Sequence, residues 1–226
     1  MTLAIFDLDN TLIGGDSDHL WGEFLCDRGV VDGEAFRRSN AAFYDDYQRG
    51  RLDIAAYAAF ALGPLAGRTP ADMEPLQQAF MAHCIDPLML PAAEALLAQH
   101  RQRGDRLLII TATNEFVTRP IAERLGVREL LGCAVELDEG RFTGRATGTL
   151  TYREGKVTRL QEWLSEEDES LEGAWFYSDS HNDLPLLEIV DKPVLVDPDA
   201  TLAAAGRERG WPAITLRSGK KPRPLT

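Results

Sequence analysis

The 226-residue chain lacks long apolar runs and has few cysteines. No uninterrupted apolar segment has the length that a membrane-spanning helix needs, so we expect no membrane partner. Cys26, Cys84 and Cys133 are odd in number, widely separated and without a C-x-x-C pair, which is typical of reduced thiols rather than a disulfide scaffold. Nothing beside any of the three favours a catalytic cysteine. The N-terminus enters an apolar stretch at once and carries an aspartate at position 7, unlike a signal peptide. We therefore expect a cytoplasmic protein.

Positive charge is also scarce. Lys and Arg number 24 against 36 Asp and Glu, giving a formal net charge of -12, which argues against a nucleic-acid partner because such proteins usually present a basic face. One lysine and a metal ion can still make a single pocket attractive to an anion. The 44% hydrophobic and 27% charged content is typical of a globular protein, and the length suits one large domain or a core with a smaller insert.

Residues 3–8 form a short apolar run with two carboxylates, Asp7 and Asp9, at its end. Such a run predicts a strand buried on both faces, as in a parallel sheet. Alternation places both carboxylates on the same side of the strand, within reach of one cation, and ligands of open α/β sheets bind beyond the carboxyl ends of the strands. The alternative is that Asp7 caps a turn and Asp9 begins a loop.

Helical spacing follows this strand. The apolar pattern predicts helices over residues 17–28, 34–49, 52–62 and 71–84, with Ser17 as the first cap. We expect residues 15–88 to form an inserted helical bundle whose aromatic residues make its own core and its contact with the main domain. Residues 1–14 and 89–226 would then form the core.

The rest of the chain alternates apolar runs with helical segments, which predicts a doubly wound parallel sheet. The expected strands cover residues 106–110, 132–137, 174–178, 192–196 and 213–216, with a hairpin at 141–145 and a further segment at 147–152. The expected helices cover residues 91–103, 115–125, a stretch from Lys156 to about 164, and 184–190. Residues 218–226 are expected to be a loose terminus.

Candidate site residues follow two more of these strands. Thr111 stands between a strand and a helix start, which is a natural anion site, although an ordinary helix cap would look the same. Asp179 and Asp183 follow another buried strand. Lys156 precedes a helix, and by itself it would be read as a surface lysine.

Together these residues resemble the haloacid dehalogenase superfamily of phosphohydrolases. Its four motifs match D-x-D-x-T at Asp7 to Thr11, Thr111 after the second strand, Lys156 before a helix, and D-x-x-x-D at Asp179 to Asp183. The segments DSHNDLPLL and ELDEGRFTG are similar to its subfamily IB, the phosphoserine-phosphatase-like branch. The resemblance implies an α/β fold, a doubly wound parallel-sheet (Rossmann-like) core with an inserted helical-bundle C1 cap.

The resemblance also implies a function for each motif. The chain would be a Mg²⁺-dependent phosphomonoesterase in which Asp7 is the nucleophile that forms an aspartyl-phosphate, and Asp9 is the acid and base. Mg²⁺ would be held by Asp7, the Asp9 carbonyl and Asp179, with Asp183 orienting the ligands. The expected phosphate-binding residues are Thr111, Ala112, Lys156 and Asn182. Asn182 could instead contact the cap.

The sequence departs from this pattern where the substrate would bind. Ala112 stands where glycine is usual, and Asp16 stands where phosphoserine phosphatases have a glutamate. Ala59 aligns with their substrate-binding arginine, so Arg51 is the nearest cation. Asp16 and Asp18 could meet an amine, as in histidinol phosphate, with phosphoserine as the alternative. His19 and His181 are either pocket or surface residues.

Two other functions remain open at this point. A phosphotransferase would use the same intermediate with an alcohol in place of water. A phospho-ligand sensor would bind without reaction, but a sensor has no need of Asp9. The sequence does not indicate the oligomeric state.

Overall fold

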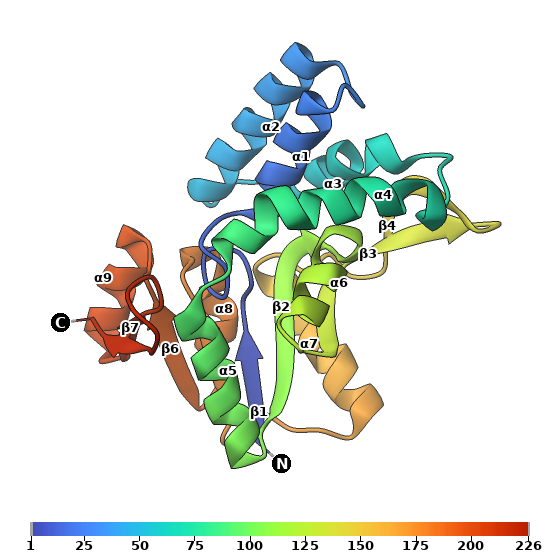
Figure 1. Cartoon of the computed structure of the whole chain (residues 1–226). Coiled ribbons are helices and arrows are strands. Elements are labelled where there is room, and N and C mark those ends of the chain that lie inside the picture. The colour runs from blue at the N-terminus through green and yellow to red at the C-terminus, as the bar shows by residue number, and fades with distance from the viewer. Residues whose placement is uncertain (1, 226) are drawn as a thin grey trace.

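The computed structural model describes residues 2–225, which fold around one central sheet (Figure 1). Within these residues the sheet has eight strands in the order β4-β3-β2-β1-β5-β6-β7-β8. The six strands from β3 to β7 are parallel, and the two edge strands β4 and β8 are antiparallel to their neighbours. The strands are β1 (Leu3–Phe6), β2 (Arg106–Asn114), β3 (Glu129–Asp138), β4 (Arg141–Thr147), β5 (Trp175–Ser178), β6 (Lys192–Val196), β7 (Ala213–Thr215) and β8 (Arg223–Pro224). The predicted doubly wound parallel sheet is confirmed.

Helices cover both faces of this sheet and bury one apolar cluster on each. The flanking helices are α5 (Pro91–Arg103), α6 (Glu115–Arg124), α7 (Glu154–Glu167), α8 (Leu184–Leu187) and α9 (Ala200–Arg209). Side chains of α5 and α6 pack with Phe6 and Ile109 on one face. Side chains of α7, α8 and α9 pack with Ile5 and Leu108 on the other. Because the centre of the sheet is buried on both faces, all of β1 and residues 107–110 of β2 are apolar.

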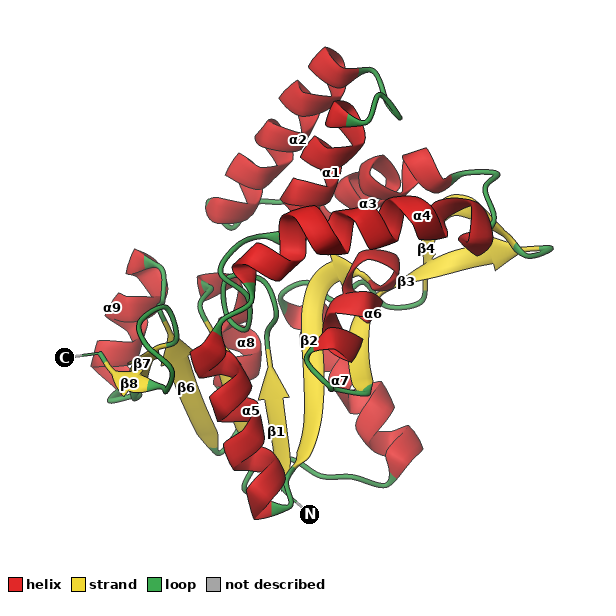
Figure 2. Cartoon of the chain, viewed as in Figure 1, coloured by secondary structure: helices red, strands yellow, loops and turns green. Residues whose placement is uncertain are grey.

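Four further helices lie above the end of the sheet toward which β1 points (Figures 1 and 2). They are α1 (Ser17–Asp27), α2 (Gly33–Gln48), α3 (Ile54–Leu62) and α4 (Pro70–Phe80), followed by a π-helical turn (Met81–Ile85) and a 3₁₀ turn (Asp86–Leu88). The two connections to the core run side by side, because Ile13 bridges Met89 and the Gly14 N–H donates to the Leu88 carbonyl at 2.8 Å. The strand ends and these four helices therefore enclose the space where the candidate residues meet.

Several elements differ from the prediction. β2 continues past residue 110 through an irregularity in its pairing with β3, so Thr111 lies within the strand and Asn114 caps α6. Asp16 caps α1 in place of Ser17, with its side chain accepting from the His19 N–H at 2.8 Å. The strand β4 ends at Thr147, and α9 was not expected from the sequence.

The C-terminal segment is also ordered differently from the prediction of a loose terminus. Arg223–Pro224 pairs antiparallel with β7, and the Leu225 N–H donates to the Ala213 carbonyl at 2.8 Å. Pro224 is tolerated here because β8 is an edge strand and the proline nitrogen, which carries no hydrogen, lies on the side away from β7.

No helix within residues 2–225 combines the length and the apolar character that crossing a membrane requires.

Candidate active site

The end of β1 places Asp7 beside the ammonium group of Lys156. Asp7 is 4% exposed, and its Oδ1 accepts a hydrogen bond from Lys156 Nζ at 2.8 Å. The same ammonium lies 2.8 Å from Asp183 Oδ1, and Ser178 Oγ donates to Asp183 Oδ2 at 2.7 Å. A buried lysine that would otherwise be costly is thus held between two carboxylates.

Burial has the largest effect on the pKa values of Asp7 and Lys156, which lie together with Asp183. Desolvation raises the pKa of Asp7 to about 7, although Lys156 opposes the change. Burial by itself would lower the pKa of Lys156, but the attraction of Asp183 and Asp7 raises it instead. Lys156 therefore stays charged and lies where it can offset negative charge next to Asp7.

The glycine before Lys156 explains how α7 begins so close to the sheet. A Cβ atom at Gly155 would lie 1.9 Å from the Leu150 carbonyl oxygen, which no larger residue tolerates. The preceding loop is fixed to β2 by Thr151, whose hydroxyl donates to the Thr111 carbonyl at 2.6 Å. Gly155 and Thr151 therefore position the start of α7 so that the ammonium group of Lys156 reaches Asp7.

Asp9 links the end of β1 both to β2 and to the helices α1–α4, which we call the cap helices. Its Oδ1 accepts from the Ser17 N–H at 2.6 Å, and its Oδ2 accepts from the Thr113 hydroxyl at 2.8 Å and from Thr111 Oγ1 at 3.5 Å. Burial, followed by the charge of Asp16, raises the pKa of Asp9 to about 6. A carboxyl group with a pKa near neutrality can both give and take a proton.

Asp179 lies on the other side of the β1 loop. Thr11 Oγ1 donates to Asp179 Oδ1 at 3.0 Å and accepts from the Asp179 N–H at 3.1 Å. Burial, with the nearby charge of Asp7, raises the pKa of Asp179 well above its ordinary value. Thr11 therefore fixes the Asp179 carboxylate close enough to Asp7 for their charges to interact.

The donor set fits a magnesium ion. When all three are ionised, Asp7, Asp179 and Asp183 place three negative charges against the single charge of Lys156, and a divalent cation would balance the group. Carboxylate, carbonyl and water oxygens are the ligands that Mg²⁺ prefers. Within residues 2–225, no three His, Cys, Asp or Glu side chains gather as a ready metal cluster. An ion held by Asp7 and Asp179 would thus also need the Asp9 carbonyl and water.

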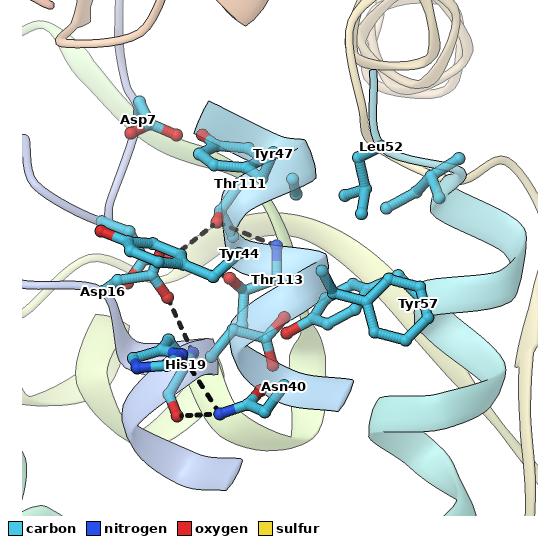
Figure 3. Close-up of a pocket in the computed structure, with 15 residues that line it drawn as sticks. Asp7, Asp16, His19, Asn40, Tyr44, Tyr47, Leu52, Tyr57, Thr111 and Thr113 are labelled. Carbon is cyan, nitrogen blue, oxygen red and sulfur yellow. Dashed lines mark hydrogen bonds between the residues drawn. The ribbon is translucent and has the colours of Figure 1, made fainter. Parts of the chain in front are cut away.

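A chamber continues from Asp7 and Asp9 into the cap helices (Figure 3). We call it the inner chamber, and it is lined by Asp7, Asp9, Asp16, Asp18, His19, Asn40, Phe43, Tyr44, Tyr47, Leu52, Ile54, Tyr57, Thr111, Ala112 and Thr113. None of these residues, all within the described part of the chain, is Lys or Arg. The wall away from the strands thus consists of two carboxylates, aromatic rings, Asn40 and two aliphatic side chains.

The two cap carboxylates are partly or wholly withdrawn from water. Burial raises the pKa of Asp16 to about 6. Burial, with the charges of Asp16 and Asp9, raises the pKa of Asp18 well above its ordinary value, and Asp18 accepts from Asn114 Nδ2 at 3.4 Å. Negative charge is therefore unfavourable here unless a positively charged group joins it.

Asn40 and His19 form one side of the inner chamber. Asn40 Nδ2 contacts His19 Nδ1 at 3.1 Å and the His19 carbonyl at 2.9 Å. Because an amide nitrogen can only donate, His19 Nδ1 is the acceptor in this contact. The His19 ring stacks on Tyr44 with centroids 4.7 Å apart.

Five of the predicted site residues do not line the inner chamber: Lys156, Asp179 and Asp183, which lie around Asp7, and Arg51 and Asn182, which lie farther out. Arg51 is 58% exposed and its Nε pairs with Asp46 Oδ1 at 2.7 Å. Asn182 instead contacts the cap, because its Nδ2 donates to the Tyr47 carbonyl at 3.1 Å and its Oδ1 accepts from Tyr152 at 3.0 Å. His181 also lies apart from the chamber and pairs with Asp199 Oδ2 at 2.8 Å.

The sequence reasoning missed Thr113, Asn40 and the chamber tyrosines. Thr113 could have been found, because alternation along a strand puts it on the same side as Thr111. Asn40 is a single polar residue on an exposed-looking helix and gave no comparable signal. The prediction assigns the tyrosines to the core of the helical bundle and to its contact with the main domain, whereas Tyr44, Tyr47 and Tyr57 line the chamber.

Comparison with known proteins agrees with this geometry. The model of the haloacid dehalogenase-like hydrolase family matches residues 4–188. A curated protein of Neisseria meningitidis serogroup C (strain 8013), named histidinol-phosphatase, is 44% identical over 95% of this chain and 99% of its own length. The phosphoserine phosphatase SerB1 of Mycobacterium tuberculosis (strain ATCC 25618 / H37Rv) is 33% identical over 96% of this chain and 72% of its own length.

A solved structure is similar over nearly the whole chain. It is a protein of unknown function from Bordetella pertussis Tohama I, 40% identical, with a TM-score of 0.88 over 94% of this chain and 98% of that one. The predicted family is thereby confirmed, and the chain belongs to the haloacid dehalogenase-like hydrolases.

Proposed function

We propose that this hydrolase is a Mg²⁺-dependent phosphomonoesterase of small phosphorylated metabolites. The observation that carries the proposal is the pairing of Asp7 with Lys156 at 2.8 Å beside Asp9, a second carboxyl whose pKa is raised to about 6. A phosphate monoester repels an attacking carboxylate, so its reaction needs positive charge at the nucleophile and a proton donor for the leaving group.

The reaction then follows from the residues present. Asp7 attacks phosphorus and forms an aspartyl-phosphate, while Asp9 gives its proton to the departing alkoxide. Asp9 next takes a proton from the water that cleaves the aspartyl-phosphate. Thr111, Lys156 and the main chain at Ala112 bind phosphoryl oxygens. Mg²⁺, when bound by Asp7, Asp179 and the Asp9 carbonyl, supplies further positive charge to the transferring group.

The favoured substrate is histidinol phosphate or another amino-alcohol phosphate without a carboxylate. Asp16 and Asp18 provide negative charge for an ammonium group, and the surrounding rings suit a cation or a planar ring. A carboxylate would find no Lys or Arg among the described residues that line the inner chamber. The 44% identity to the protein named histidinol-phosphatase supports the same choice.

Phosphoserine is the second candidate. The 33% identity to the protein named phosphoserine phosphatase SerB1 favours it, as does the position of Asp16, which stands where such enzymes bind an amino group. Its carboxylate would need a donor other than Arg51, such as the His19 ring.

We further propose that residues 15–88 act as a cap that closes over the inner chamber. The paired connections at Gly14 and Leu88 would serve as its hinges. Protease cleavage at these connections should slow when a phosphate mimic is bound, and equal cleavage would contradict closure.

The reaction is tested by phosphate release from the purified protein with Mg²⁺ or with a chelator, together with trapping of the labelled enzyme. Acid quenching during turnover of a ³²P-labelled substrate should leave label on the peptide that contains Asp7. Phosphate release without any labelled enzyme would contradict the aspartyl-phosphate. Absence of Mg²⁺-dependent release from a broad set of phosphomonoesters would instead favour a phospho-ligand sensor.

A further inference from the structure

Tyr44 and Tyr47 separate the inner chamber from a second cavity at the cap–core boundary. We call the second cavity the outer cleft, and its lining includes Asn10, Asp179, Ser180 and Arg217. These two tyrosines are the residues common to both linings, and they lie one turn apart on α2. Asp7 and Asp9 face the inner chamber, whereas Asp179 faces the outer cleft. The tyrosines therefore form a wall across the site.

Both the main chain and the ring of Tyr47 contact the core, and these contacts hold the residue in the wall. Its carbonyl accepts from Asn182 Nδ2 at 3.1 Å, and its ring lies 6.0 Å from that of Tyr152, centroid to centroid. Two residues beyond the end of α2, the Gly50 carbonyl accepts from Arg153 at 2.9 Å. Arg153 immediately precedes α7, which carries Lys156, and Asn182 adjoins Asp183 in a 3₁₀ turn (His181–Asp183), so the end of α2 is fixed directly to the segments that carry these two residues.

Tyr47 lines the inner chamber together with Asp7 and Asp9, and the outer cleft together with Asp179 and Ser180. Burial, and after it the charges of Asp7, Asp179 and Asp183, raise the pKa of the Tyr47 hydroxyl well above its ordinary value. Figure 3 shows Tyr47 and Asp7 among the residues around the inner chamber. The aromatic group therefore occupies the approach from the outer cleft to Asp7, and it is the bulk of the ring that fills this approach.

We propose that Tyr47 controls which acceptor reaches the aspartyl-phosphate, admitting water and excluding larger alcohols that enter from the outer cleft. This inference rests on the proposed function. With water, the bond between phosphorus and Asp7 breaks, a new P–O bond forms to the water oxygen, and Asp9 takes the proton. With an alcohol ROH the same bond breaks, the new bond leads to the RO oxygen, and Asp9 takes the hydroxyl proton, so the product is an alkyl phosphate.

The test is the partition of the phosphoryl group between water and an added acceptor. Phosphate and alkyl phosphate are measured during turnover of histidinol phosphate with 1,3-propanediol present. We expect Tyr47→Ala to raise the ratio of alkyl phosphate to phosphate about fivefold or more, since the approach to the intermediate is opened. Tyr47→Phe keeps the ring and should keep the wild-type ratio. Tyr57→Ala is the matched control, because Tyr57 lines the inner chamber but not the outer cleft.

Each result decides the proposal. An unchanged ratio in Tyr47→Ala would overturn it, as would an equal rise in Tyr57→Ala, which would mean that chamber volume alone matters. If Tyr47→Ala does not fold, Tyr47→Leu is measured and should still exceed Tyr47→Phe. Failure of the proposed function itself is distinguishable, because the wild-type protein would then form neither product.

Discussion

The candidate site has two halves, the strand ends around Asp7 and the cap side of the inner chamber, and they are built on different principles. At the strand ends, the acidic groups are tied to fixed partners: Asp7 and Asp183 to Lys156, and Asp179 to Thr11. On the cap side, Asp16 and Asp18 lie among aromatic rings, and no Lys or Arg within the described chain lines the chamber. The comparison teaches that the acidic groups at the strand ends already have partners within the protein. The carboxylates on the cap side instead need positive charge from a substrate.

Substitution of the proposed nucleophile in the strand-end half should have the largest effect on activity. Asp7→Asn should lower phosphate release by about a thousandfold or more on every substrate, because an amide cannot form the acyl phosphate. The substitution is close in shape, so the fold should persist by circular dichroism. More than a tenth of wild-type activity in this variant would contradict the assignment.

Asp9 tests whether the strand-end half supplies the proton. Asp9→Asn should lower kcat by about a hundredfold for an alkyl phosphate. The loss should be much smaller in the first step for p-nitrophenyl phosphate, whose leaving group needs no proton. Burst kinetics with p-nitrophenyl phosphate would check this, and an equal loss of the burst rate for both substrates would argue that Asp9 acts in another way.

Asp16 tests whether the cap half recognises the amine. Asp16→Asn should raise KM for histidinol phosphate about tenfold while leaving p-nitrophenyl phosphate nearly unaffected. Asparagine is as good a helix cap as aspartate, so α1 should keep its start. A matched loss on both substrates would place Asp16 in the reaction rather than in recognition.

Arg51 should have the smallest effect of the four. Its side chain is 58% exposed and pairs with Asp46 outside the chamber, so Arg51→Ala should change kcat/KM less than about twofold. Steady-state kinetics on histidinol phosphate and phosphoserine would check it. A selective loss on phosphoserine would revive Arg51 as a carboxylate partner.

The sequence predicted the strand-end half better than the cap half for a physical reason. Asp7, Thr111 and Asp179 each lie at or near the end of a buried strand, where an apolar run makes a polar residue conspicuous. Parallel topology then forces such ends together, so their meeting could be foreseen. The roles of these residues remain predictions.

The cap half depends on how helices pack, which no short pattern specifies. Tyr47 and Asn40 look like ordinary residues of an amphipathic helix, and only the crossing of α1 and α2 turns them toward the chamber. Arg51 was chosen by sequence distance, but its guanidinium points to Asp46. The pairing of Arg223–Pro224 with β7 was missed because a proline-containing tail carries no strand signal.

The most direct test of the account is the ratio of kcat/KM for histidinol phosphate to that for phosphoserine, measured with Mg²⁺ on the wild-type protein. The account predicts a ratio of about ten or more, because the chamber offers carboxylates to an amine and no Lys or Arg to a carboxylate. A ratio near one, or a preference for phosphoserine, would contradict the assignment of the cap half as an amine-binding wall.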